Sequence, residues 1–498
     1  MVSGPAVDLL LGDVEVGGRR VDVAVVDGRI AWVEEPGPEG GRVARAADAV
    51  VIDGRGGALL PGLHDHHVHL HAMAARHAGV DLDALPDPGA VDAALRAVIE
   101  TASGSRRSGN RNVVSHGGAV WVRAAGYDEH RHGPLDRWRL DALAGDVAVR
   151  VQHRSGLSWV VSSAALSGLG LLDGTGSGAP APSRPDGVEV DERGEPTGWL
   201  HRSDLWLAGR LPARVEIDLG AVGHQLAGYG ITGVTDATYA IGSERLRSLR
   251  RARASGELPQ RIVVLGDDDE ASVAGWAELG PAKLLADEVL GLDVDALAAA
   301  VGRWHATGRP VAIHAVTRVE CVAAVTALAA AGPLFGDRIE HGSVLPPELD
   351  GVLRDGGITV VVQPSLVLER GDHHLVAVEG DDLAHLHRHA SLLAAGVRVG
   401  VGSDAPVTSA DPWQGIAAAS RRTSRSGAAV GPAEAVDPEV ALGWYLADPA
   451  DPGGPARRVE PGRPADLCLL DVPLEVALTD PSPTHVRSTW VGGTLVHG

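Results

Sequence analysis

The densest group of metal-binding residue types in the chain lies between residues 64 and 71, where five of the eight residues are histidine. The apolar run Ala58–Leu60 precedes the group and predicts a short buried strand, followed by a Pro-Gly turn. Because residues two apart in an extended segment point to the same side, His67 and His69 can aim both imidazoles at one divalent cation. His71 shares their face, whereas the other two histidines have the opposite parity.

Four further residues that could serve a metal site follow, or lie on, short apolar runs: Lys283, His314, His341 and Asp404. Taken singly, each is weak evidence. A histidine at the end of a strand is more often a capping group than a ligand, and an aspartate before Ala-Pro also fits a turn cap. If the chain formed one barrel and these four residues lay with the histidine pair at the same end of it, coincidence would be a poor explanation.

Lys283 has a second distinguishing feature, because it is the single lysine among 44 basic residues. The abundance of alanine, glycine, valine and arginine indicates a coding bias that favours arginine over lysine. A position that keeps lysine against this bias is expected to need a primary amine rather than a positive charge.

The elements that would position these residues follow a regular pattern from about residue 218 onward, in which helical segments alternate with short apolar runs. Seven such pairs and the strand at 58–60 give eight βα units, which is typical of a closed parallel (β/α)8 TIM-like barrel of the α/β class. In such a barrel the chemistry lies at the C-terminal ends of the strands. The expected pairs are 219–229 with 233–235, 243–255 with 261–265, 273–279 with 283–285, 294–306 with 310–313, 319–331 with 338–340, 347–355 with 359–363, and 385–395 with 398–402.

Both ends of the chain are rich in strand signals. Val21–Val26 and Ile30–Val33 flank an Asp-Gly turn, and residues 487–497 contain two strands around a Gly-Gly turn. We therefore expect residues 1–57 and 455–498 to form a small composite β-sandwich domain. Residues 58–454 would form the barrel, with an insertion at about 72–215 after its first strand.

Composition limits the class of protein and of partner. The formal net charge of −21 and the absence of a long apolar run argue against nucleic acid and membranes as partners. The two cysteines, Cys321 and Cys468, form no disulfide framework, and no signal peptide is recognisable. We expect a cytoplasmic protein that acts on a small molecule and leave open whether it forms a homodimer.

Several motifs resemble those of a known family. The motifs are Leu-Pro-Gly-Leu-His-Asp-His-His-Val-His-Leu, Pro-Val-Ala-Ile-His-Ala, Arg-Ile-Glu-His-Gly and Gly-Ser-Asp-Ala-Pro. They resemble the metal motifs of the amidohydrolase superfamily, and the long insertion most resembles its branch that contains N-substituted formamide deformylase. Glu460–Asp471 is similar to the family's return to the small sheet domain, so the resemblance covers nearly the whole chain.

The resemblance implies an amidohydrolase acting on carbon–nitrogen bonds other than peptide bonds, with two divalent metal ions, expected to be zinc. His67 and His69 would bind the first ion with Asp404 beside them. His314 and His341 would bind the second, and Lys283, as its CO₂-derived carbamate, would bridge the two. A metal-bridged hydroxide would attack the scissile group of an amide, an N-acyl or N-formyl amine or a related substrate, with Asp404 as the proton acceptor. Trp121, Trp159 and Gln363 are candidate substrate-binding residues.

Two other functions stay open at this stage. A mononuclear deaminase of the same superfamily usually has a glutamate close after the fifth-strand histidine, but here Glu320 lies six residues beyond His314. Lys283 would also have no role in such an enzyme. A non-catalytic scaffold that lost its metals is the other alternative, and the presence of all six candidate ligands argues against it.

Overall fold

The structure is a computed structural model, and it describes residues 7–35, 49–83, 85–104, 113–116, 119–154, 156, 158–172, 185, 187–203, 206–207, 210, 217–266, 270–289, 291–378 and 380–498. The chain divides into two compact units. The first unit comprises residues 1–70 and 222–498, and the second comprises residues 71–221. The expected end of the insertion, near residue 215, lies outside the described residues.

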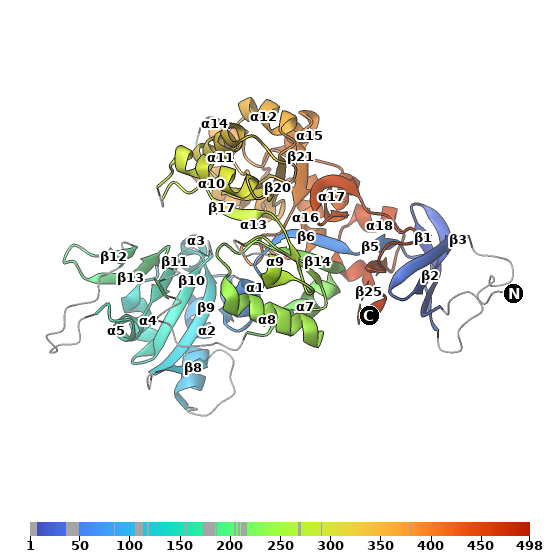
Figure 1. Ribbon diagram of the computed structural model, residues 1–498. Helices are drawn as coiled ribbons and strands as arrows, with labels where there is room; N and C mark the ends of the chain where they lie inside the picture. The colour runs from blue at the N-terminus through green and yellow to red at the C-terminus, as the bar shows by residue number, and fades with distance from the viewer. Residues whose placement is uncertain are drawn as a thin grey trace. The chain divides into compact units, whose positions relative to one another are not determined.

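Two small sheets of the first unit come from the ends of the chain. In Figure 1 the blue N-terminal strands lie beside red C-terminal elements, and apolar residues of both sheets share one core cluster. The Asp27-Gly28 turn between β2 and β3 has φ values of 47° and 70°, as a tight hairpin requires. One sheet has the order β3-β2-β1-β4, with β1 (Leu9–Val16), β2 (Arg19–Val26), β3 (Arg29–Glu34) and β4 (Val50–Asp53). The other has the order β26-β25-β24-β5, with β5 (Leu59–Pro61), β24 (Leu467–Leu470), β25 (Val486–Val491) and β26 (Thr494–His497).

The placement of β5 corrects one expectation. The apolar run before the histidines pairs with β24 of the small sheet and is not the first strand of the parallel sheets. That strand is β6 (Leu63–Val68), which contains the first histidines itself and pairs with β14 (Ile231–Asp236). All six residues of β6 are buried although four of them are polar, so a search for an apolar run overlooks this strand.

The first unit also contains two parallel sheets, which give the chain the expected α/β character. Their strand orders are β16-β15-β14-β6 and β17-β18-β19-β20-β21. Backbone contacts join the two sheets at both seams: Lys283 N donates to Leu265 O at 2.7 Å, and Val68 forms a parallel bridge with Ala405. The other strands are β15 (Arg261–Val264), β16 (Glu278–Leu279), β17 (Ala282–Leu285), β18 (Val311–Ala315), β19 (Arg338–His341), β20 (Thr359–Val362) and β21 (Arg398–Val401).

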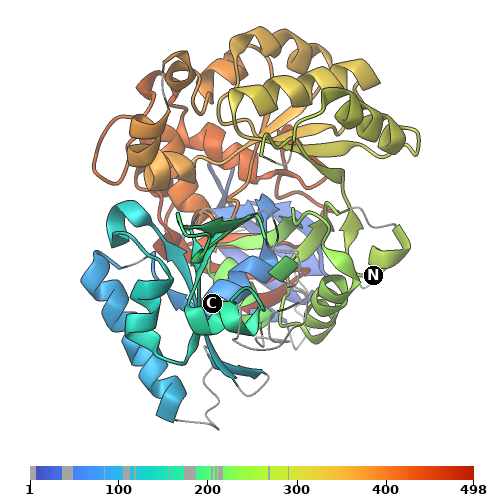
Figure 2. The ribbon, with the colours of Figure 1, turned by 90° about the vertical axis from the view of Figure 1, so that its left-hand side faces the viewer.

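The helices between these strands mostly match the expected segments, and Figure 2 shows the yellow ones along the outer side of the five-stranded sheet. They are α7 (Leu219–Gly228), α8 (Gly242–Ser255), α10 (Val294–His305), α11 (Arg318–Ala331) and α12 (Asp350–Asp355). The chain continues with α16 (Pro412–Arg421), α17 (Pro438–Tyr445), the hairpin of β22 (Ala447–Asp448) and β23 (Asp451–Ala456), and α18 (Leu474–Thr479).

The expected helix at 273–279 is wrong, and the one expected at 385–395 is confirmed only over the short helix at 390–394. Residues 273–279 contain only the end of α9 (Glu270–Val273) and the short strand β16. The helical content between β20 and β21 lies mainly in α13 (Ser365–Ala377), with α14 (Asp381–Ala384) and α15 (Ala390–Ala394) after it. Gly371 in the middle of α13 weakens the helix signal in the sequence, because glycine is a poor helix former. The structure needs glycine at this position, since a Cβ there would come within 2.8 Å of the side chain of Val430.

The second unit contains a mixed sheet of order β12-β13-β11-β10-β9-β7, to which β8 is added beside β9. Two apolar clusters form its core. None of the helices in the described part of the chain is both long and apolar enough to cross a membrane. The elements are α1 (Leu70–His77), β7 (Val80–Asp81), α2 (Pro88–Gly104), β8 (Val113–His116), β9 (Ala119–Tyr127), α3 (Glu129–His132), α4 (Arg137–Ala144), β10 (Ala148–His153), β11 (Ser158–Val161), α5 (Ser163–Gly168), β12 (Val188–Val190) and β13 (Pro196–His201).

Candidate metal centre

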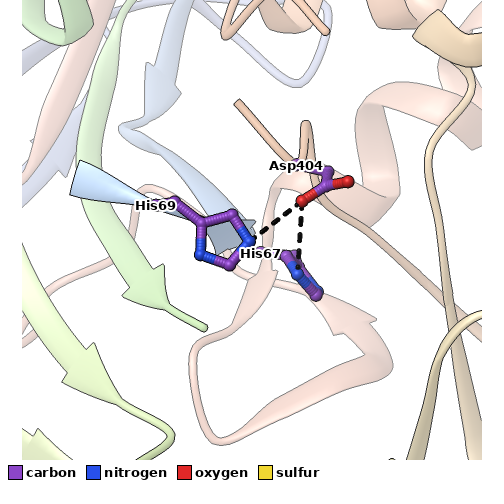
Figure 3. Close-up of side chains that lie close together, drawn as sticks. All are labelled: His67, His69 and Asp404. Atoms are coloured by element: carbon purple, nitrogen blue, oxygen red, sulfur yellow. Dashed lines mark ion pairs between the residues drawn. The ribbon is translucent and has the colours of Figure 1, made fainter. Parts of the chain in front are cut away.

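His67, His69 and Asp404 come together at the end of β6, as Figure 3 shows. Asp404 Oδ1 lies 3.1 Å from His69 Nε2 and 3.5 Å from His67 Nε2. Among the described residues this is the one group of three or more ligand-type side chains whose donor atoms all lie within 4.8 Å of one another. Two imidazole nitrogens and a carboxylate oxygen are a donor set that suits zinc and several other divalent cations.

The backbone around this group places the three side chains together. Asp404 N donates to His67 O at 2.7 Å, and His69 N donates to Ala405 O at 2.9 Å, so the two segments run side by side. Gly402 permits this approach, since a Cβ there would lie 2.4 Å from the Cβ of His67. Asp404 has a φ of 58°, a conformation that residues other than glycine adopt at a cost and that recurs at functional sites.

The second ring nitrogen of each histidine has a partner of its own. His67 Nδ1 contacts the buried carboxylate of Glu340, which Arg338 also contacts, and His69 Nδ1 lies 3.3 Å from Thr238 Oγ1. A carboxylate at Nδ1 favours the tautomer with its proton there, which leaves the Nε2 lone pair directed toward Asp404. Burial, followed by the charge of Lys283, lowers the pKa of His67 to about 3, so its imidazole is neutral at pH 7.

His314 and His341 extend the cluster of imidazoles. The ring of His341 lies 4.8 Å from that of His67 and 4.6 Å from that of His314, measured between centroids. Gln363 Oε1 lies 2.9 Å from His341 Nδ1, an arrangement that holds the ring by one nitrogen. Burial lowers the pKa of both His314 and His341, so both are neutral bases that could bind a cation.

Lys283 lies on β17 with only 3% of its surface exposed, and its Nζ has no hydrogen-bond partner among the described residues. Burial lowers its pKa to about 8, against the attraction of Glu340. Burying an amine without a hydrogen-bond partner costs free energy, so Lys283 is expected to interact with a further group. The donor set fits a divalent metal centre, and the buried amine of Lys283 would fit beside it once converted to a neutral or anionic group.

The candidate substrate residues have other surroundings. Gln363 is buried and joins His341 to Val361 O, to which its Nε2 donates at 2.9 Å. Trp121 and Trp159 are 5% and 6% exposed and belong to an apolar core cluster of the second unit. Their role in substrate binding stays a prediction.

Sequence reasoning missed the residues that hold the ligands in place. Glu340 and Arg338 belong to the Arg-Ile-Glu-His motif, directly before His341. Two charged residues on a strand that is expected to be buried could have indicated a buried ion pair near the site. Thr238 has no comparable signal.

Comparisons with known proteins identify the family of the chain. The model of the Amidohydrolase family matches residues 50–497. N-substituted formamide deformylase of Arthrobacter pascens is 27% identical, over 96% of this chain and 97% of that protein. Putative amidohydrolase YtcJ of Bacillus subtilis (strain 168) is 25% identical, over 74% of each protein. An uncharacterized metal-dependent hydrolase from Pyrococcus horikoshii OT3 has a similar fold, with a TM-score of 0.71 at 18% identity, over 96% of this chain and 98% of that one.

These findings confirm the predicted superfamily and its branch, and with them the expected class of enzyme, a hydrolase of carbon–nitrogen bonds other than peptide bonds. The family match extends from β4 to the last strand of the chain and includes every residue of the candidate centre. The chain belongs to the amidohydrolase family.

Proposed function

We propose that this protein is a metal-dependent hydrolase that cleaves the carbon–nitrogen bond of an N-formyl or N-acyl amine, or of a related amide. The observation that carries the proposal is the group of His67, His69 and Asp404, in a chain whose family is that of the amidohydrolases. The similarity to N-substituted formamide deformylase over nearly the whole length supports an acyl amine as the substrate.

We also propose that the two parallel sheets form one closed (β/α)8 barrel. The backbone contacts at both seams support it, because they join the residue after β15 to β17 and the segment after β21 to the end of β6. In such a barrel the candidate ligands share the C-terminal end, where the active sites of this architecture lie. Residues 1–57 and 455–498 would then form the small domain beside it, and residues of about 72–215 the insertion.

In this proposal His67, His69 and Asp404 would hold a first divalent cation, expected to be zinc, and His314 and His341 would hold a second. Lys283, converted to its carbamate by CO₂, would supply an anionic ligand. When bound, such cations lower the pKa of a coordinated water toward neutrality and polarise the carbonyl of the substrate.

Asp404 is the group we assign to proton transfer. Although burial opposes ionisation, the hydrogen bond with His69 and the neighbouring histidines hold the pKa of Asp404 below its usual range, so it is a carboxylate at pH 7. Its Oδ1 is near both histidines, and a water there could lose its proton to the carboxylate. The same carboxyl would then deliver that proton to the leaving nitrogen.

Metal content tests the assignment of two sites. Protein prepared with bicarbonate and zinc should contain close to two metal ions per chain by elemental analysis. A single equivalent would favour a mononuclear centre. A purified protein that takes up no metal would contradict the proposed function and favour a scaffold.

Asp404→Asn tests the proton acceptor. The amide oxygen can still face a cation but cannot accept a proton, so most of the metal should be retained while turnover falls by ~10²–10⁴-fold. The rate of hydrolysis of the best N-formyl or N-acyl amine from a substrate screen is the measurement. A variant within threefold of the parent rate would show that another group takes the proton.

A further inference from the structure

Asp65 is a buried carboxylate that the proposed mechanism does not use. It lies on β6, two residues before His67, and none of its surface is exposed. Its Oδ1 accepts from His67 N and from Ser403 N, both at 3.0 Å, and its Oδ2 accepts from Ser403 Oγ at 2.5 Å. One carboxylate therefore binds the backbone of a candidate ligand on β6 and the residue that directly precedes Asp404.

Further hydrogen bonds of Ser403 link Asp65 to the turn that contains Asp404. Ser403 Oγ accepts from Ala405 N at 3.0 Å, and Ser403 O accepts from Thr408 Oγ1 at 2.5 Å. Asp404 therefore lies between Ser403 and Ala405, whose backbone N–H is bonded to the side chain of that serine. Its left-handed backbone can persist only where such contacts hold it.

The chemistry of these contacts calls for a carboxylate. Three donors, two N–H groups and one hydroxyl, point at the side chain of Asp65, and a carboxylate is a group that only accepts. An asparagine would keep one oxygen for the two N–H groups but would place an NH₂ donor against the hydroxyl of Ser403.

We propose that Asp65 is a positioning residue of the first metal site, which sets the separation between His67 and Asp404 before a cation binds. This inference rests on the proposed function, because it assumes that both residues are ligands. Loss of such a supporting contact typically lowers metal affinity by ~10–100-fold.

The experiment compares Asp65→Asn with the parent and with Ser403→Ala. Ser403→Ala is the matched variant, since it removes the bond to Oδ2 but leaves both backbone donors on Oδ1. Each protein is stripped with a chelator, and its thermal unfolding and circular dichroism are measured without metal. Affinity for Zn²⁺ is then determined by competition with a chromophoric chelator, and the visible spectrum of the Co²⁺-loaded protein reports the geometry of the ligands.

We expect metal-free Asp65→Asn to be folded, with Zn²⁺ bound ~10–100-fold more weakly than by the parent and with an altered Co²⁺ spectrum. Ser403→Ala should show the same change to a smaller extent, at least threefold in affinity. Asp65→Asn that is folded and binds Zn²⁺ within twofold of the parent would overturn the inference. If Asp65→Asn does not fold, Ser403→Ala decides, and parent-like affinity and spectrum in that variant overturn the inference. Failure of the proposed function is distinct from these outcomes, because the parent itself would then bind no metal.

Discussion

Replacing His67 or His69 by alanine should remove the first metal ion and nearly all hydrolytic activity. Both imidazoles face Asp404 Oδ1, and the structure offers no other pair of side chains at that carboxylate among the residues it describes. The loss should exceed the ~10–100-fold that removal of an outer supporting residue costs, because a ligand itself is gone. Elemental analysis of the zinc-loaded variants should show one metal ion fewer per chain than the parent.

His130→Ala is the matched control for the general loss of a histidine, since 66% of that side chain is exposed. It should keep the metal content and the rate of the parent. Full activity in both His67→Ala and His69→Ala would show that neighbouring histidines are the true ligands. His64 is a poor substitute, because its Nε2 already lies 2.9 Å from Thr235 Oγ1.

The spacing of His67 and His69 could be predicted because it depends only on local geometry. In an extended chain the side chains alternate, so the parity of two residues settles whether they share a face. Asp404 could be predicted from a different local signal, its position after an apolar run that is the strand β21 in the structure. The α/β character likewise follows from a periodic pattern within short windows.

The elements that were missed depend on distant contacts. β6 has a polar sequence, yet it is buried, and several of its polar side chains have partners far away in the chain: Ser403 for Asp65, Thr235 for His64 and Glu340 for His67. Glu340 and His67 are 273 residues apart in the chain, and no local pattern reveals that they touch. Side-chain partners at this separation become visible only when the sheets are assembled.

The proposed carbamate of Lys283 can be tested by replacing this one side chain. In the proposed centre an ammonium beside two divalent cations would be strongly repelled, so Lys283 would have to be neutral or become an anion. Burial lowers its pKa to about 8, so much more of it is the neutral amine than for an ordinary lysine. The amine nitrogen can then bond to the carbon of CO₂ and release one proton, which gives the carbamate.

Lys283→Arg should therefore be as inactive as Lys283→Ala, although it conserves the charge, because a guanidinium stays protonated and forms no stable carbamate. Lys283→Ala leaves room for a small carboxylic acid, so millimolar acetate or propionate should restore part of both metal content and activity. The arginine variant should show no such rescue, since its side chain fills the space and keeps its positive charge. Metal content and hydrolysis rate, measured with and without the added acid, separate these results. An active Lys283→Arg would exclude the carbamate and leave the lysine a structural or substrate-binding role.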